Sequence, residues 1–201
     1  MAFTFFFRDS HTIAQIIKYF LPTVEGYSRI KVWDAGCAMG PEVYTFAIML
    51  AEKMGYFPFK RVFIDATDID ENDTFADIVR KGVYSYEDLK RIPEDVFKKY
   101  FEKYDENNHY RISDLIRSRV EFAKHDLLTL QPKGTGYNLI FCKNVLLHFQ
   151  QSERIKVIDM FWKSLSPGGI FATEQTQQMP EELKKRWKKL ASDANVYQKI
   201  G

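Results

Sequence analysis

The sequence predicts an α/β protein built around a doubly wound sheet. Two segments rich in β-forming residues, 29–36 and 61–70, each end in acidic residues. Between them, residues 41–55 have helical periodicity, with a proline at the first turn and Gly55 past the end. The succession of strand, glycine-containing turn, helix and acid-ended strand is typical of the opening of such a sheet.

The same patterns predict the elements outside this opening. Residues 9–21 place isoleucines at helical spacing, with Ser10 as the expected N-cap and Pro22 as the stop. The remaining expected elements are a short helix at 71–80, strands at 120–128 and 137–145, a helix at 152–165, a turn and strand within 166–174, an amphipathic helix at 180–193 and a closing strand at 194–200.

Residues 82–119 interrupt the alternation of strands and helices. They contain short helical pieces and turn-forming residues around 106–108 that predict a hairpin. We therefore expect one domain over residues 1–201, with a small subdomain at 82–119 inserted in a crossover of the sheet.

Composition excludes several classes of protein. The 201 residues are 45% apolar and 28% charged, which is ordinary for a globular domain, and the net charge of +2 does not argue for nucleic acid. Two cysteines indicate no disulfide framework and fit a reducing cytoplasm. No signal peptide or apolar run long enough to span a membrane is expected.

The turn after the first strand is the strongest local clue to a ligand. Gly36 and Gly40 follow Asp34, and they let the backbone pass close to a bound molecule. The next helix directs its first N–H groups into the same space. The spacing is G-x-x-x-G and not the dinucleotide pattern, so a plain tight turn is the alternative.

Acidic residues at two further strand ends strengthen this interpretation. Asp68 and Asp70 end the second strand, where a carboxylate can accept ribose hydroxyls, and Asp126 follows the third, where it could accept from an adenine amino group. Helix N-caps are the alternative for each. Three such ends favour a nucleoside, and without a P-loop pattern they point to S-adenosylmethionine rather than ATP. The histidines have no metal-ligand spacing, so no metal is expected.

Several motifs then follow one another in the order seen in the CheR family of chemotaxis receptor methyltransferases, which the chain resembles over nearly its whole length. They are TFFFRD at 4–9, VWDAGCAMGPEVYT at 32–45, ATDID at 66–70, GVYSYEDLKRIP at 82–93, YRI at 110–112, VEFAKHDLL at 120–128, IFCKNVLLHF at 140–149 and LSPGG at 165–169. The resemblance implies a Rossmann-like class I methyltransferase fold and an S-adenosylmethionine-dependent enzyme that esterifies glutamates on chemoreceptors.

The resemblance also implies roles for individual residues. Glu42 resembles the acid that holds the methionine amino group, Asp68 the ribose-binding acid, and Asp126 with Leu127 the adenine-side pair. Arg8 and His148 are the expected catalytic residues. The full set expected at the cofactor is Thr4, Arg8, Gly36, Glu42, Asp68, Asp126, Leu127, Lys143 and Asn144. The segment 82–119 resembles a subdomain that in some members docks a receptor tail peptide.

The chain departs from the family pattern at several points. Lys143 stands where the family has arginine, His148 where it has tyrosine, and TEQTQQ replaces an acidic ending. The family's N-terminal helical domain has no counterpart before Thr4. We therefore expect reduced activity, with a catalytically degenerate cofactor-binding module as the alternative. A methyltransferase acting on RNA or a small molecule would depend only on the basic segment 184–189.

Overall fold

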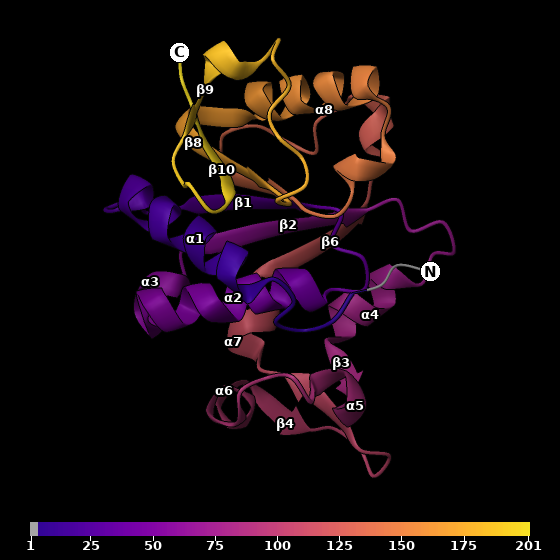
Figure 1. The fold of residues 1–201 in the computed structure, drawn as a ribbon. Coiled ribbons are helices and arrows are strands. Elements are labelled where there is room, and N and C mark those ends of the chain that lie inside the picture. Colours follow the sequence, from indigo (N-terminus) through magenta and orange to yellow (C-terminus); the bar gives the residue numbers. More distant parts are fainter. Residues whose placement is uncertain (1–3) are drawn as a thin grey trace.

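The computed structural model describes residues 4–201 and contains a seven-stranded sheet in the order β6-β2-β1-β7-β8-β10-β9 (Figure 1). Neighbours from β6 to β8 pair in parallel, whereas β10 is antiparallel to both β8 and β9. The strands are β1 (Ile30–Ala35), β2 (Val62–Asp68), β6 (Val120–Lys124), β7 (Tyr137–Cys142), β8 (Leu165–Thr173), β9 (Trp187–Lys189) and β10 (Asn195–Lys199). The predicted α/β fold class is confirmed.

Helices cover the two faces of this sheet, as Figure 1 shows, with α8 on one side and α1 and α2 on the other. The expected helices at 9–21, 41–55 and 152–165 are confirmed, although Asp9 rather than Ser10 occupies the first N-cap position. The bounds are α1 (Ser10–Phe20), η1 (Leu21–Val24), α2 (Pro41–Met54), α3 (Tyr56–Phe59), α4 (Phe75–Lys81), η2 (Leu127–Thr129), η3 (Leu146–His148) and α8 (Gln151–Ser164).

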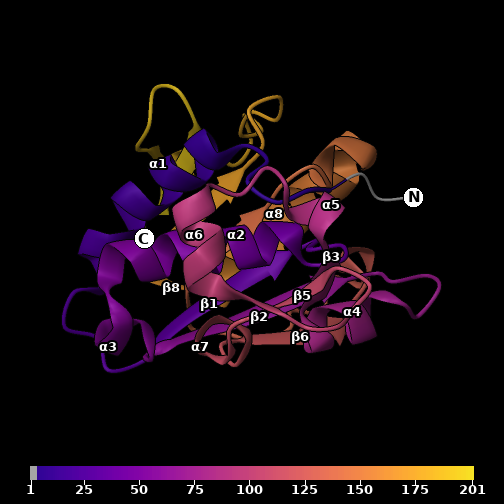
Figure 2. The same ribbon diagram turned by 90° about the horizontal axis from the view of Figure 1, so that it is seen from below.

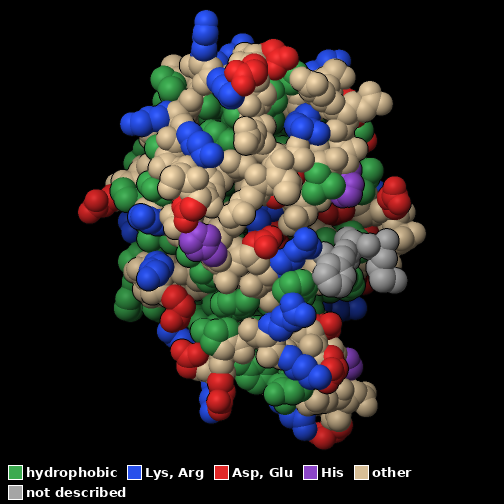
Figure 3. All heavy atoms as spheres, viewed as in Figure 1, with side chains coloured by type: hydrophobic (Ala, Val, Ile, Leu, Met, Phe, Trp, Pro, Cys, Tyr) green, Lys and Arg blue, Asp and Glu red, His purple; other side chains and the backbone are tan. Residues whose placement is uncertain are grey.

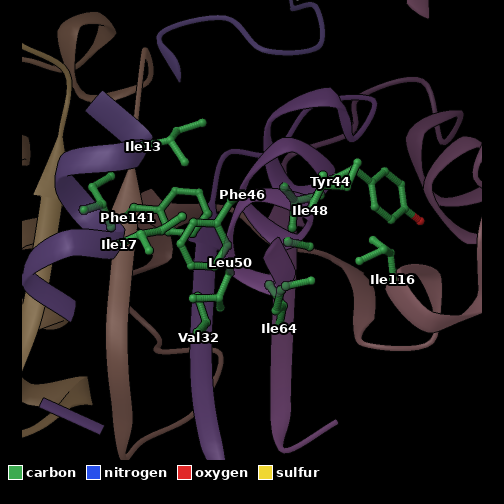
Figure 4. Packing of buried hydrophobic residues seen from close by; sticks show 14 of the residues in the cluster. Ile13, Ile17, Val32, Tyr44, Phe46, Ile48, Leu50, Ile64, Ile116 and Phe141 are labelled. Carbon is green, nitrogen blue, oxygen red and sulfur yellow. The ribbon is translucent and has the colours of Figure 1, made fainter. Parts of the chain in front are cut away.

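Alternating side chains of the strands build one core on each face. On the α2 side, Val32, Phe46 and Phe141 are fully buried together (Figure 4). On the α8 side, Trp33 lies edge-on to Phe161, with ring centroids 5.2 Å apart. Burial of each large apolar side chain stabilises the fold by about 1.5–3 kcal/mol. The two cores therefore fix the strands whose carboxyl ends carry the predicted site.

A three-stranded antiparallel sheet, in the order β3-β5-β4, lies within the segment 82–119. Seen from below in Figure 2, it and α6 lie in front of α2. The hairpin expected around 106–108 joins β4 to β5 and is confirmed. The bounds are β3 (Val83–Ser85), α5 (Tyr86–Leu89), α6 (Glu94–Tyr100), β4 (Phe101–Lys103), β5 (His109–Ile112) and α7 (Asp114–Arg117). The division into a domain and an inserted subdomain stays a prediction.

The prediction of an amphipathic helix at 180–193 is wrong. Turns and a short 3-10 helix, η4 (Lys184–Arg186), lead instead into β9, which pairs with β10. Trp187 is buried against Phe171, with centroids 5.4 Å apart, while Lys188 and Lys189 are exposed. Lysines on an exposed edge strand discourage pairing with other chains. Among residues 4–201, no helix is long and apolar enough to cross a membrane.

Candidate functional site

A cavity of about 590 Å³ opens at the carboxyl ends of β1, β2, β6 and β7. Parallel strands bring their carboxyl ends to one edge of the sheet, which explains why residues so far apart in the chain meet here. The predicted site residues that line this cavity are Thr4, Arg8, Gly36, Glu42, Asp68, Asp126, Leu127, Lys143, Asn144 and His148. Their individual roles stay predictions.

The turn between β1 and α2 packs tightly against the segment after β7. Gly36 has φ 113°, and a Cβ at this position would lie 2.2 Å from Cγ2 of Val145. The Gly36 N–H donates to the Thr67 carbonyl at 2.7 Å, and the Ala38 N–H donates to the Asp68 carboxylate at 2.9 Å. A side chain at Gly36 would therefore force apart two walls of the cavity.

The three acids at strand ends have different surroundings. Asp70 does not line the cavity. Although burial acts the other way, N–H groups of Phe75, Thr74 and Ala76 hold its pKa below the usual range. Asp70 thus accepts from the first N–H groups of α4, although Thr74 and not Asp70 occupies the N-cap position. Asp126 accepts from the Leu128 N–H at 2.8 Å and also lines the cavity, as Asp68 does.

Lys143 ends an apolar strand and its side chain is buried. Its Nζ lies 3.0 Å from Oε2 of Glu42 and 3.4 Å from Oδ2 of Asp9. Burial raises the pKa of Glu42, and the neighbouring Lys143 ammonium opposes this rise. The two carboxylates offset the desolvation of the ammonium, which would be costly if it were buried alone.

Asn144 adopts a left-handed backbone conformation, with φ 59°. Its N–H donates to Oε2 of Glu174 at 3.0 Å, and its side-chain oxygen accepts from Arg8 at 3.4 Å. Thr173 also donates to that Glu174 oxygen, at 2.7 Å. Glu174 therefore holds the turn that carries Lys143 and Asn144. Sequence reasoning did not assign it a role, although it lies within the unassigned TEQTQQ segment.

Asp34 is a second acid that the sequence analysis did not place among the site residues. It is fully buried, and neither carboxylate oxygen has a hydrogen-bond partner in the described chain. Burial and then the nearby Glu42 raise its pKa well above the ordinary value, with Lys143 acting in the opposite sense. Asp34 therefore stays protonated to a higher pH than an exposed aspartate.

The cavity's chemistry fits S-adenosylmethionine. Glu42 has a second carboxylate oxygen, Oε1, that is buried, has no hydrogen-bond partner among residues 4–201 and can accept from an ammonium group. Asp68 lines the cavity with a carboxylate that can accept hydrogen bonds from hydroxyl groups, and Leu127 and Phe149 line it with apolar side chains. Acidic groups of this kind complement a ligand that carries an ammonium and a sulfonium.

His148 lies on the exposed part of the cavity wall, in η3. Its backbone N–H donates to the Val145 carbonyl at 3.0 Å, whereas its imidazole makes no hydrogen bond to the described residues. The ring is therefore available to a molecule that enters the cavity. The lining residues that sequence reasoning missed are neighbours of predicted ones, among them Cys37, Ala38, Thr67, Ile69 and Val145.

Two solved structures with a similar fold are methyltransferases at low sequence identity. Magnesium protoporphyrin IX methyltransferase from Synechocystis PCC 6803 is 15% identical with a TM-score of 0.52, covering 95% of this chain and 79% of that one. The N-methyltransferase NodS from Bradyrhizobium japonicum is 14% identical with a TM-score of 0.50, covering 96% and 88%. At these identities the likeness supports the fold alone.

Curated relatives are closer in sequence. Chemotaxis protein methyltransferase 2 of Pseudomonas aeruginosa is 30% identical over 171 residues, which are 84% of this chain and 60% of that protein. The chemotaxis protein methyltransferase of Escherichia coli K12 is 29% identical over 83% of this chain and 57% of that protein. The chain thus spans about three fifths of the length of these relatives. The family model described as CheR methyltransferase, SAM binding domain, matches residues 2–196. The chain therefore belongs to the CheR methyltransferase family, within its S-adenosylmethionine-binding domain.

Proposed function

We propose that this chain is a methyltransferase that forms γ-methyl esters on glutamate side chains of chemoreceptor cytoplasmic domains. The observation that carries the proposal is the single cavity that gathers the ten predicted site residues at the carboxyl edge of the sheet. The names of the curated relatives support the same reaction class. A cytoplasmic location and a protein rather than nucleic-acid partner belong to this proposal.

When bound, the cofactor supplies an electrophilic methyl group on its sulfonium and leaves as S-adenosylhomocysteine. The chain's residues bind and orient the reactants. Glu42 accepts from the cofactor's amino group, Asp68 accepts from the ribose and Asp126 with Leu127 contacts the adenine. Alignment and exclusion of water of this kind can lower a barrier by up to about 7–11 kcal/mol.

The acceptor needs no general base. A glutamate has a reference pKa of about 4.3, so its carboxylate is already ionised near neutral pH. In the proposal, Arg8 pairs with this carboxylate and the exposed His148 imidazole donates a hydrogen bond to it. A hydrogen bond to a charged group contributes about 1.5–3 kcal/mol, so loss of either contact should slow methyl transfer by about 10–100-fold.

The test is incubation of the chain with methyl-labelled S-adenosylmethionine and chemoreceptor cytoplasmic fragments from the same cell. The proposal predicts label on the receptor that mild base releases as methanol, which is diagnostic of an ester. Label that resists base, or no label on any receptor fragment, would contradict the substrate assignment.

The second candidate is a degenerate module that binds the cofactor without turnover. It is favoured by Lys143 and His148, which replace the arginine and tyrosine expected from the family resemblance. This candidate predicts that calorimetry detects cofactor binding while the ester assay stays silent. It also predicts that His148→Tyr, alone or with Lys143→Arg, restores labelling. Labelling by the unaltered chain would exclude it.

A further inference from the structure

A group of aromatic and cationic side chains, all exposed except the half-buried Arg119, lies at the amino-terminal edge of the main sheet. Its cations stand directly before or close to the first residues of three adjacent strands, β1, β2 and β6, and its other residues belong to α3 and β2. Figure 3 shows hydrophobic and basic side chains intermixed along the left-hand edge, the side on which α3 lies in Figure 1. We call this group the aromatic–cationic surface; its members are Arg29, Tyr56, Phe57, Lys60, Phe63 and Arg119.

The aromatic rings of this surface are unusually open to solvent. Phe57 is 78% exposed, Tyr56 52% and Phe63 40%. Phe57 has no polar atom to compensate for this exposure, and it lies in a four-residue helix that projects between α2 and β2. Grouped exposed apolar side chains mark interaction sites more often than single ones do.

Cations of the same surface lie over these rings. The guanidinium of Arg29 is 4.4 Å from the centre of the Phe63 ring, and that of Arg119 is 5.5 Å from it. The Lys60 ammonium is 4.3 Å from the Tyr56 ring and 5.6 Å from the Phe57 ring. The ring faces are therefore already occupied by the protein's own cations.

The positive charge of this surface is not neutralised by ion pairs. Within residues 4–201, no carboxylate lies within 4.0 Å of the charged groups of Arg29, Lys60 or Arg119. Lysines on α4 and α6, by contrast, pair with carboxylates. Two exposed acids, Glu25 and Glu121, lie near Arg29 and Arg119 in the chain, and neither forms an ion pair with the cations of the surface. The surface is thus free to receive an anionic partner.

We propose that the aromatic–cationic surface binds the anionic headgroup layer of a lipid bilayer. Cations near such a layer are attracted to its phosphates, and aromatic side chains favour the depth at which headgroups meet acyl chains. Phe57, the most exposed ring of this surface, is the side chain best placed to enter that layer. Stacking of nucleic-acid bases on these rings would compete with the cations that already lie over them. This contact is peripheral and involves no transmembrane span.

The location of the surface keeps such docking compatible with an open cavity. Strands β1 and β2 run from the surface to the cavity, so the two lie at opposite edges of the sheet. At about 3.3 Å per residue, a six-residue strand separates them by about 20 Å. A bilayer bound at one edge would therefore leave the other edge accessible. The proposal does not depend on the identity of the methyl acceptor.

The test is co-sedimentation of the 201-residue chain with vesicles of phosphatidylcholine alone or with 30% phosphatidylglycerol. We expect binding to the anionic vesicles only, and loss of that binding as NaCl rises from 50 to 500 mM. Replacing two surface cations, Arg29→Gln with Lys60→Gln, should weaken partitioning by about thirtyfold. The matched control, Lys98→Gln with Lys184→Gln, changes the net charge equally outside the surface and should bind as the parent does.

A second readout does not depend on vesicle sedimentation. Phe57→Trp places a fluorophore at the tip of the surface, and its emission should shift to the blue with anionic vesicles and not with neutral ones. Equal weakening by the control pair, binding to neutral vesicles, or no shift at position 57 would overturn the proposal. Tighter binding to a labelled oligouridylate than to the anionic vesicles would overturn it in favour of nucleic acid.

Discussion

The stability of an Asp34→Asn variant relative to that of the parent protein should increase as the pH rises. The parent carboxyl group is fully buried and has no hydrogen-bond partner in the described part of the chain, and burial together with Glu42 raises its pKa. In the unfolded chain an aspartate ionises near pH 3.9. Between that value and the folded pKa, the folded state binds more protons, so each added pH unit removes about 1.4 kcal/mol of stability from the parent.

Asp34→Asn removes this titration, so the difference between the variant and the parent should grow by up to about 1.4 kcal/mol per pH unit until the pH reaches the folded pKa. The buried side-chain amide of the variant lowers its free energy of unfolding by about 1–3 kcal/mol at every pH. This cost offsets the difference between variant and parent by a constant amount and does not change how that difference depends on pH.

Urea denaturation of both proteins at pH 4.5, 5.5 and 6.5 measures this difference. Asp77→Asn is the matched control, because Asp77 is exposed and pairs with Lys81 at 3.6 Å. The Asp77→Asn change should alter the free energy of unfolding by no more than about 0.5 kcal/mol at each pH. A difference for Asp34→Asn that does not change with pH would refute the reasoning.

Three further changes test other contacts. Lys143→Met leaves the buried carboxylate of Glu42 without its ion-pair partner and should lower the free energy of unfolding by about 3–5 kcal/mol in urea denaturation; no loss would show that the ion pair is not buried as described. Gly36→Ala should weaken calorimetric binding of S-adenosylhomocysteine at least tenfold, because its Cβ meets Val145, and unchanged affinity would place the turn elsewhere. Phe46→Ala should cost about 3–5 kcal/mol of unfolding free energy, and a cost below 1 kcal/mol would contradict its place in the core.

The sequence was most informative where a residue pattern depends on the local chain alone. The strand at 29–36 and the helix at 41–55 appear within a residue or two, because the β-forming residues, Pro41 and Gly55 are local signals. Asp68 and Asp126 reach one cavity because parallel strands share one carboxyl edge, whereas Asp70 does not. That argument needs only the order of elements and not their packing.

Features decided by tertiary packing could not be predicted. The basic residues around Trp187 are compatible with a helix, and only pairing with β10 selects the strand. The properties of Asp34 and Glu174 depend on their surroundings in the fold. Asp34 is buried without a hydrogen-bond partner among the described residues, and Glu174 accepts from the N–H of Asn144. No pattern along the chain distinguishes these carboxylates from solvated ones.

The most direct test of the central claim is calorimetric titration with S-adenosylhomocysteine of the parent chain, Asp68→Ala and the exposed control Asp77→Ala. If the cavity is the cofactor site, the parent and Asp77→Ala should bind one equivalent with equal affinity. Asp68→Ala should bind about 10–100-fold more weakly, because it loses the acceptor for the ribose hydroxyls. No binding by the parent, or equal affinity for Asp68→Ala, would contradict the account.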